Sequence, residues 1–205
     1  SLIQLLEERG EQEEAALYRE RLEEIIRGLI VDLIDGQPDA GTATRLITLG
    51  DDLRAQNQHE EAIQFYDAAI ALNPNLIAAY NNKAKSLETL SRLEEALVAY
   101  GDAIDTVPLS SRIDPERLNL SEADALSTTY SNLGDLYLRR RELQLAEDAY
   151  DLSIAIHPRL LASDINAAEA NFITGSLLGD QARALERQGA TDLAESRWQR
   201  ALGSY

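Results

Sequence analysis

The chain has 205 residues and no Cys, which excludes disulfides, thiolate metal sites and cysteine nucleophiles. Its formal charge of −17, from 36 acidic against 19 basic residues, repels phosphate backbones and anionic lipid headgroups, so neither nucleic acid nor a membrane is expected as a partner. With 44% hydrophobic residues, only five Pro and apolar residues mostly three or four apart, the sequence predicts an all-α fold with a substantial core.

The sequence opens in the middle of an apolar pattern at residues 2–6 and contains no Met. No basic segment or long apolar region of a signal peptide is present there. We therefore interpret the chain as part of a longer protein. The compartment cannot be read from the sequence, and a cytoplasmic location is our working expectation.

Residues 1–36 are predicted to form an N-terminal helical segment. Residues 11–35 carry one apolar stripe of a long helix, and a shorter helix precedes it. The short helix and the start of the long one resemble the end of a degenerate repeat with Arg19 in an aromatic slot. Residues 37–42 are the predicted linker, because Gly and Pro break the helical pattern there. The apolar positions are Leu17, Leu22, Ile25, Ile26, Leu29, Ile30 and Leu33.

A recurring pattern organises the rest of the chain. The series that runs from Leu46 to Pro74 starts again at Tyr80, and two insertions delay its further starts to Tyr130 and Leu178. Small residues that face each other across a hairpin let its two helices approach closely. A small residue, an Ala and an aromatic occupy the same slots in each copy: Gly50, Ala62 and Tyr66; Ala84, Ala96 and Tyr100; Gly134, Ala146 and Tyr150; Ala182, Ala194 and Trp198.

These slots resemble the tetratricopeptide repeat, a pair of antiparallel helices that recurs every ~34 residues. The resemblance implies an all-α, right-handed superhelical solenoid of helical hairpins over residues 43–205. Its repeats would be 43–76, 77–110, 127–160 and 175–205, with insertions at 111–126 and 161–174.

Turns and helix ends follow from residue types. Asn57 and Gly189 suit the left-handed conformation that ends a helix, whereas Ser91 and Arg141 suit it less well. The dipeptides at 73–74, 107–108 and 157–158 are each predicted to close a second helix, since a residue before Pro avoids the helical region.

The two insertions allow alternative structures. Either both extend the first helix of the following repeat, with starts near Ser121 and Ser163, or residues 109–120 form a loop or lid.

The resemblance implies that the first helices of the hairpins line a concave surface that binds a protein or an extended peptide. Five basic and five acidic residues fall on it, which favours an uncharged or mixed-charge partner: Arg54, Lys85, Arg139, Arg183 and Arg187 against Asp51, Glu88, Asp135, Asp180 and Glu186. The partner-binding candidates are Thr48, Asp51, Asn81, Asn82, Lys85, Asn132, Asp135, Arg139 and Arg183.

Asn82 and Asn132 occupy equivalent slots, where an amide can both donate to and accept from a partner's backbone. One tetratricopeptide subclass grips C-terminal carboxylates of chaperones with Lys, Arg and Asn in set slots. Ile47, Asp51, Thr128 and Asn132 stand in those slots here, and only Asn82 agrees, so this clamp is not expected.

Neither catalysis nor a cofactor is predicted. His59 and His157 lie near a turn and a repeat junction without metal-ligand spacing, and we expect both at the surface. The acidic runs are typical of solvated helix starts. No glycine-rich phosphate loop is present, and no serine has a plausible base.

The sequence thus favours a protein-binding adaptor, scaffold or assembly factor. The alternative is a self-associating structural arm of a larger protein. Trp198 should pack under a following helix that the sequence does not contain, which predicts an uncovered apolar end. The chain would then continue, two copies would dock there, or the fourth repeat would cover itself.

Overall fold

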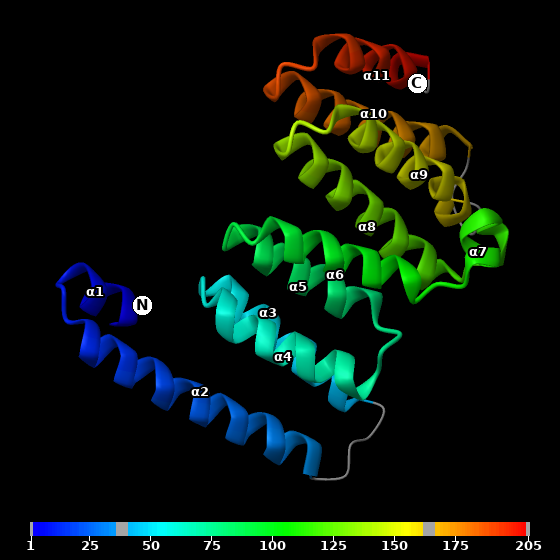
Figure 1. The fold of residues 1–205 in the computed structure, drawn as a ribbon. Helices are drawn as coiled ribbons and strands as arrows, with labels where there is room; N and C mark the ends of the chain where they lie inside the picture. Colours follow the sequence, from blue (N-terminus) through cyan, green and yellow to red (C-terminus); the bar gives the residue numbers. More distant parts are fainter. Residues whose placement is uncertain (1, 36–40, 162–166, 204–205) are drawn as a thin grey trace. The chain divides into compact units, whose positions relative to one another are not determined.

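The computed structural model describes residues 2–35, 41–161 and 167–203, and these residues are almost entirely helical (Figure 1). The helices are α1 (Leu2–Glu8), α2 (Gln12–Asp35), α3 (Thr42–Ala55), α4 (His59–Leu72), α5 (Ile77–Thr89), α6 (Leu93–Asp105), α7 (Leu109–Ile113), the short 3-10 helix η1 (Pro115–Arg117), α8 (Leu120–Arg139), α9 (Leu143–Leu161), α10 (Ala167–Arg187) and α11 (Thr191–Gly203). They form two compact units, residues 1–96 and 97–205.

Antiparallel hairpins are the building block of both units. In the first unit α1 pairs with α2 and α3 with α4, and α5 packs on α4. In the second unit α8 pairs with α9 and α10 with α11. The predicted all-α class of paired antiparallel helices is therefore confirmed.

One kind of backbone turn joins the helices of the repeat hairpins. Asn57, Ser91, Arg141 and Gly189 all have φ between 60° and 77°, so Ser91 and Arg141 adopt the left-handed conformation despite their side chains. In each turn the next backbone N–H donates to the carbonyl five residues earlier, as Gln58 does to Leu53 at 2.9 Å. This bond satisfies a carbonyl that the helix end would otherwise leave unpaired.

The α1–α2 turn has the same geometry, which supports the degenerate-repeat interpretation of the N-terminal segment. Gly10 has φ 78°, and the N–H of Glu11 donates to the carbonyl of Leu6 at 2.9 Å. Ala15, five residues after Gly10, is buried like Ala62 five residues after Asn57. The hairpin architecture therefore begins at α1.

The apolar stripe predicted along residues 11–35 divides into two rows. Ile26 is buried with Leu46, Phe65, Ala69 and Ala79, and Leu22 and Ile30 pack partly against this cluster. The other row stays at the surface, because α3 and α4 cover only one side of α2. The exposed large apolar residues of α2 are Leu17, Tyr18, Ile25, Leu29 and Val31.

The first insertion, residues 111–126, contains elements of both predicted alternatives. Residues 120–126 are the first two turns of α8, so this part extends the repeat helix, with Asn119 and Glu122 forming a capping box at its start. Residues 109–117 form α7 and η1 instead of an open loop, and Leu118 is buried. The predicted helix start at Ser163 lies outside the described residues.

Pro closes two of the three second helices as predicted, but not the third. α4 ends at Leu72 before Pro74, and α6 ends at Asp105 before Pro108. α9 instead continues through Pro158 to Leu161, so the prediction that His157–Pro158 ends the helix is wrong. A proline inside a helix removes one backbone hydrogen bond, and the preference of its predecessor against helical angles can be overridden.

The glycines of the small-residue slot make room for a tyrosine ring. A Cβ on Gly50 would lie 2.6 Å from Cε1 of Tyr66, and one on Gly134 would meet Tyr150 in the same way. Both rings are fully buried. The close approach predicted between Gly50 and Ala62 is thus governed by the aromatic residue four positions further along α4.

We expect Gly50→Ala to destabilise the protein by about 1 to 3 kcal/mol, because the ring of Tyr66 must shift in a packed core. Gly28→Ala is the matched control: it lies inside α2 with open space around its Cβ position. This change should stabilise by about 0.5 to 1 kcal/mol through helix propensity. Urea unfolding measures both, and a Gly50→Ala protein as stable as the Gly28→Ala protein contradicts the packing argument.

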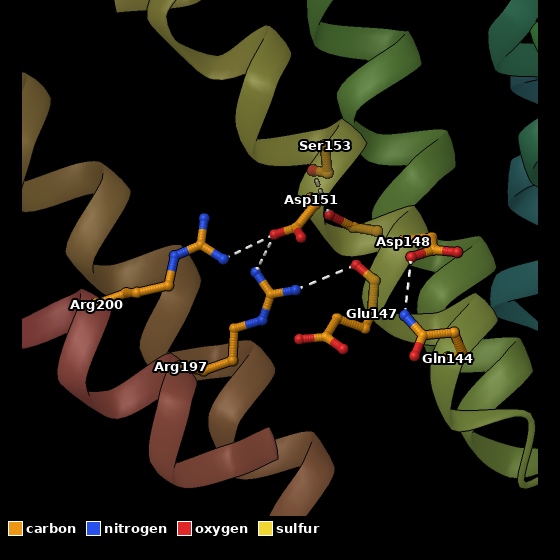
Figure 2. A network of polar contacts seen from close by, with 8 residues as sticks. Gln144, Glu147, Asp148, Asp151, Ser153, Arg197 and Arg200 are labelled. Carbon is orange, nitrogen blue, oxygen red and sulfur yellow. Dashed lines mark hydrogen bonds and ion pairs between the residues drawn. The ribbon is translucent and has the colours of Figure 1, made fainter. Parts of the chain in front are cut away.

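A buried arginine joins α11 to α9 within the second unit (Figure 2). Arg197 is 1% exposed and donates to Oδ1 of Asp151 at 2.8 Å and to the carbonyl of Glu147 at 3.1 Å. Its guanidinium also lies over the ring of Tyr150, 5.9 Å from the centroid. Arg200 reaches the same oxygen of Asp151 at 2.8 Å, so one carboxylate receives two guanidinium groups.

These contacts set the ionisation of Asp151. Partial burial alone would raise its pKa, but the hydrogen bond from Arg200 and the charge of Arg197 outweigh burial, and the pKa falls below its ordinary value of 3.8. A carboxylate whose pKa is lower in the folded chain stabilises the fold above its unfolded pKa. That stabilisation is lost as the pH falls through the folded pKa.

Asp151→Asn should therefore cost roughly 2 kcal/mol at neutral pH, since it leaves the buried Arg197 without its countercharge. The difference from the wild type should shrink below about pH 4. Urea unfolding across this pH range tests the prediction. Asp148→Asn on the same helix is the control and should change little, because it removes the charge of a carboxylate whose partner is the neutral amide of the exposed Gln144. A pH-independent difference for Asp151→Asn contradicts the ion-pair account.

Candidate functional site

Asp51 is the centre of a polar cluster on α3, α4 and α5, which contact one another in the first unit. Its Oδ1 accepts hydrogen bonds from the Tyr66 hydroxyl at 2.7 Å and the Asn82 amide at 2.9 Å. The Arg54 guanidinium lies 3.3 Å from the same oxygen. About two fifths of the Asp51 side chain remains accessible. The cluster is thus a neutralised carboxylate at the surface, held by three donors.

The predicted site residues of this unit differ in accessibility. Thr48 is exposed, but its hydroxyl donates to the carbonyl of Thr44 at 3.0 Å. Lys85 is partly exposed, with its ammonium 3.8 Å from the buried Glu88. Asn81 is only 6% exposed, so its side chain faces the interior and presents little surface to a partner. Among the five candidates, Asp51 and Asn82 are joined by a direct hydrogen bond.

The second unit repeats the acid–tyrosine contact. The Tyr150 hydroxyl donates to Oδ1 of Asp135 at 2.5 Å, with the same separation along the chain as between Tyr66 and Asp51. Burial raises the pKa of Tyr66 and Tyr150 above the ordinary value of 10.0, and the neighbouring aspartates raise it further. Both phenols therefore stay protonated and act as donors.

Asn132, Asp135 and Arg139 follow one another along a single face of α8. Asp135 and Arg139 are exposed and Asn132 is partly exposed. Unlike Asn82, Asn132 makes no side-chain hydrogen bond to any residue that the structure describes. Its amide therefore retains donors and an acceptor for another chain.

In the last hairpin the acid–tyrosine pair is replaced by a cation–aromatic pair. Arg183, in the slot of Asp51, pairs with Asp180 and lies over the ring of Trp198, 5.6 Å from the centroid. The Trp198 indole N–H donates to Glu186 at 2.8 Å. Trp198 is thus partly covered by its own hairpin, which was one of the three expectations for this end, and the exposed apolar residue nearby is Leu202.

Sequence reasoning did not identify Tyr66, Tyr150 or Trp198 as parts of these polar clusters. The signal is present, since a charged slot precedes the aromatic slot at the same spacing in all three hairpins. His59 was expected at the surface but is partly buried at the start of α4. Burial, and then the charge of Arg54, lowers its pKa from 6.5.

Within residues 2–35, 41–161 and 167–203 no cluster of His, Asp or Glu could hold a metal ion. Nor is any helix in the described part of the chain long and apolar enough to cross a membrane.

A succession of antiparallel helical hairpins joined by one recurring turn defines a helical-repeat protein. Two family models match this chain, one described as TPR repeat over residues 50–91 and one as Tetratricopeptide repeat over residues 126–164. Together with the slot pattern and the hairpins, they show that this is a tetratricopeptide repeat-containing protein. Such repeats are protein–protein interaction modules.

Two curated relatives share part of the sequence. The Dictyostelium discoideum "Protein STIP1 homolog" is 32% identical over 108 residues, which is 52% of this chain and 17% of that protein. The Arabidopsis thaliana "Inactive TPR repeat-containing thioredoxin TTL3" is 32% identical over 98 residues, 48% of this chain and 12% of that protein. The chain thus spans less than a fifth of either relative.

Two solved structures share the fold. A crystal structure of MamA matches with a TM-score of 0.55 and 20% identity, covering 91% of this chain and 92% of that one. A crystal structure of BtubC (BKLC) from P. vanneervenii matches with a TM-score of 0.60 and 21% identity, covering 99% and 76%. At this level of identity the likeness concerns the fold alone.

Tyr66→Phe should destabilise the protein by about 1.5 to 3 kcal/mol, because it removes a hydrogen bond to a charged acceptor while keeping the ring beside Gly50. Asp51→Asn, which keeps an acceptor but removes the charge, should cost less. Urea unfolding of both variants measures the difference. Equal stability of Tyr66→Phe and the wild type contradicts a structural role for this hydrogen bond.

Proposed function

We propose that this chain is an adaptor, scaffold or assembly factor that binds a protein partner through the polar faces of its first helices. In the first unit the face is carried by Asp51 and Asn82, and in the second unit by Asn132, Asp135 and Arg139. The observation that carries the proposal is the partly exposed Asn132 amide, which is not hydrogen-bonded to any described residue, on a face whose neighbours are also polar and accessible.

The chemistry of these faces favours an uncharged or mixed-charge segment in extended conformation. Arg54 already balances the charge of Asp51, and two neutral donors occupy the same oxygen, so a basic partner gains little there. An extended backbone presents alternating N–H and C=O groups, and an Asn side chain can bond to both. Backbone contacts then supply affinity, and neighbouring side chains select the sequence.

The Asn82 contact also bears on the carboxylate clamp that the sequence argues against. Asn82, the one residue that agrees with the clamp pattern, donates its amide hydrogen bond to Asp51. Asp51 itself occupies a slot in which the clamp has a hydrogen-bond donor. A partner's terminal carboxylate placed here would be repelled by the carboxylate of Asp51, whose countercharge Arg54 is already engaged. We therefore expect an internal segment of the partner, not its C-terminus, to bind.

Asn132→Ala tests the proposal, with Gln144→Ala as control because Gln144 is an exposed amide on the second helix of the same hairpin. A partner captured from native extract is identified by mass spectrometry, purified and titrated against the wild type and both variants. We expect Asn132→Ala to weaken binding by about tenfold, the size of one lost pair of hydrogen bonds, and Gln144→Ala to leave it unchanged.

Asn82→Ala with Gln56→Ala as its control gives the same comparison in the first unit. The polar faces are ruled out as the binding site if Asn132→Ala and Asn82→Ala each bind the partner as tightly as their respective control variants. If the only protein recovered is the chain itself, the alternative of a self-associating structural arm is favoured. Circular dichroism of each variant confirms that the helices are intact.

A further inference from the structure

The N-terminal hairpin lacks the glycine–tyrosine packing pair of the α3–α4 and α8–α9 hairpins. In these two hairpins the glycine lies seven residues before the left-handed turn residue, and the tyrosine lies nine residues after it. The glycines are Gly50 and Gly134, and the tyrosines are Tyr66 and Tyr150. Counted from Gly10, the same two slots hold Ile3 and Arg19. Arg19 pairs with Glu7 at 2.5 Å instead of filling the hairpin with a ring. The interior contact of a repeat is therefore missing between α1 and α2.

A cleft of about 450 Å³ lies at this place, between the α1–α2 hairpin and the start of α4. It adjoins a second hollow of about 370 Å³ that shares Ile3, Leu22, Gln58 and Glu61 with it. Both Ile3 and Arg19 line the larger hollow. All of these residues belong to the first unit, and none belongs to the Asp51–Asn82 cluster.

An apolar row along α2 forms the floor of the smaller hollow and continues beyond it. Tyr18, Leu22 and Ile25 line the smaller hollow, and Tyr18 and Ile25 are 44% and 54% exposed. Leu29, 51% exposed, continues the row at the spacing i, i+4, i+7, i+11. Such a row covers three turns of helix, about 16 Å, and is the seam along which a second helix packs. Its period matches an amphipathic helix better than an extended strand.

The rim of the cleft is acidic. Glu7, Glu23, Glu60 and Glu61 line it, against Arg19 and Arg21. Glu7 and Glu60 are paired with Arg19 and Arg92, at 2.5 and 3.0 Å. Glu23 and Glu61 form no ion pair with any residue in the described part of the chain. Two carboxylates beside an apolar floor complement lysine or arginine on the flanks of an apolar helix face.

We propose that this cleft is a second docking site, which receives a basic amphipathic α-helix of a partner protein. Apolar side chains of that helix pack along Tyr18, Leu22, Ile25 and Leu29, while its Lys or Arg residues pair with Glu23 and Glu61. The site is independent of the polar faces described above, and a partner can use one without the other.

A fluorescein-labelled synthetic peptide tests this proposal: a helical peptide of about five turns with Leu along one face and Lys on both flanks, long enough to cover the row. Fluorescence anisotropy follows its titration with the full chain. We expect saturable binding, weakened about tenfold or more by Ile25→Asp, which places a desolvated charge on the floor. Leu17→Asp, at a similarly exposed apolar position on α2 that lines neither hollow, is the control and should not change binding.

Charge recognition is tested separately with the double change Glu23→Lys, Glu61→Lys and with the same peptide carrying Glu in place of Lys. Both changes should weaken binding and reverse its salt dependence, because each places like charges opposite one another and salt screens their repulsion. Absence of saturable binding, equal effects of Ile25→Asp and Leu17→Asp, or equal binding of the Glu peptide overturns the proposal. Asn82→Ala should leave peptide binding intact, so this result is separable from failure of the polar-face proposal.

Sedimentation of the wild type without peptide distinguishes another occupant. A dimer that Ile25→Asp dissociates and Leu17→Asp does not would show that the cleft receives a second copy of this chain, and it would overturn the assignment to a basic partner helix.

Discussion

The close approach of two helices within a hairpin is the constraint on which the proposed binding faces depend. Gly50 and Gly134 lack a Cβ where the rings of Tyr66 and Tyr150 pass, and the rings are fully buried there. Because each ring is fixed by this contact, its hydroxyl emerges at a defined point and meets Asp51 or Asp135. The packing of the interior thus decides where the surface carboxylates stand, and Asn82 is positioned in turn by Asp51.

The hairpins and their turns could be predicted from the sequence because they rest on local rules that recur. Four copies of a small residue, an alanine and an aromatic at fixed spacing leave few alternatives to helical repeats. The same reasoning underestimated Ser91 and Arg141, whose left-handed angles are fixed by backbone hydrogen bonds across the turn and not by residue preference. It failed at Pro158, where α9 continues although the local preference is to stop.

The candidate site was predictable as a face but not as a set of contacts. Slot counting placed Asp51 and Asn82 on first helices, yet no rule of spacing says that Asn82 donates to Asp51 in the preceding repeat. Asn81, its neighbour in sequence, is buried, since one residue along a helix turns a side chain by about 100°. Arg197 could not be anticipated either, because a buried arginine depends on the countercharge of Asp151 on another helix.

The α1–α2 hairpin keeps the backbone turn of the repeats but has lost the glycine–tyrosine pair that packs between their helices. The turn at Gly10 and the buried Ala15 preserve the frame, while Ile3 and Arg19 stand where a glycine and a tyrosine would close it. A duplicated structural element can in this way acquire a recess by substitution at two interior positions, without insertion of a loop.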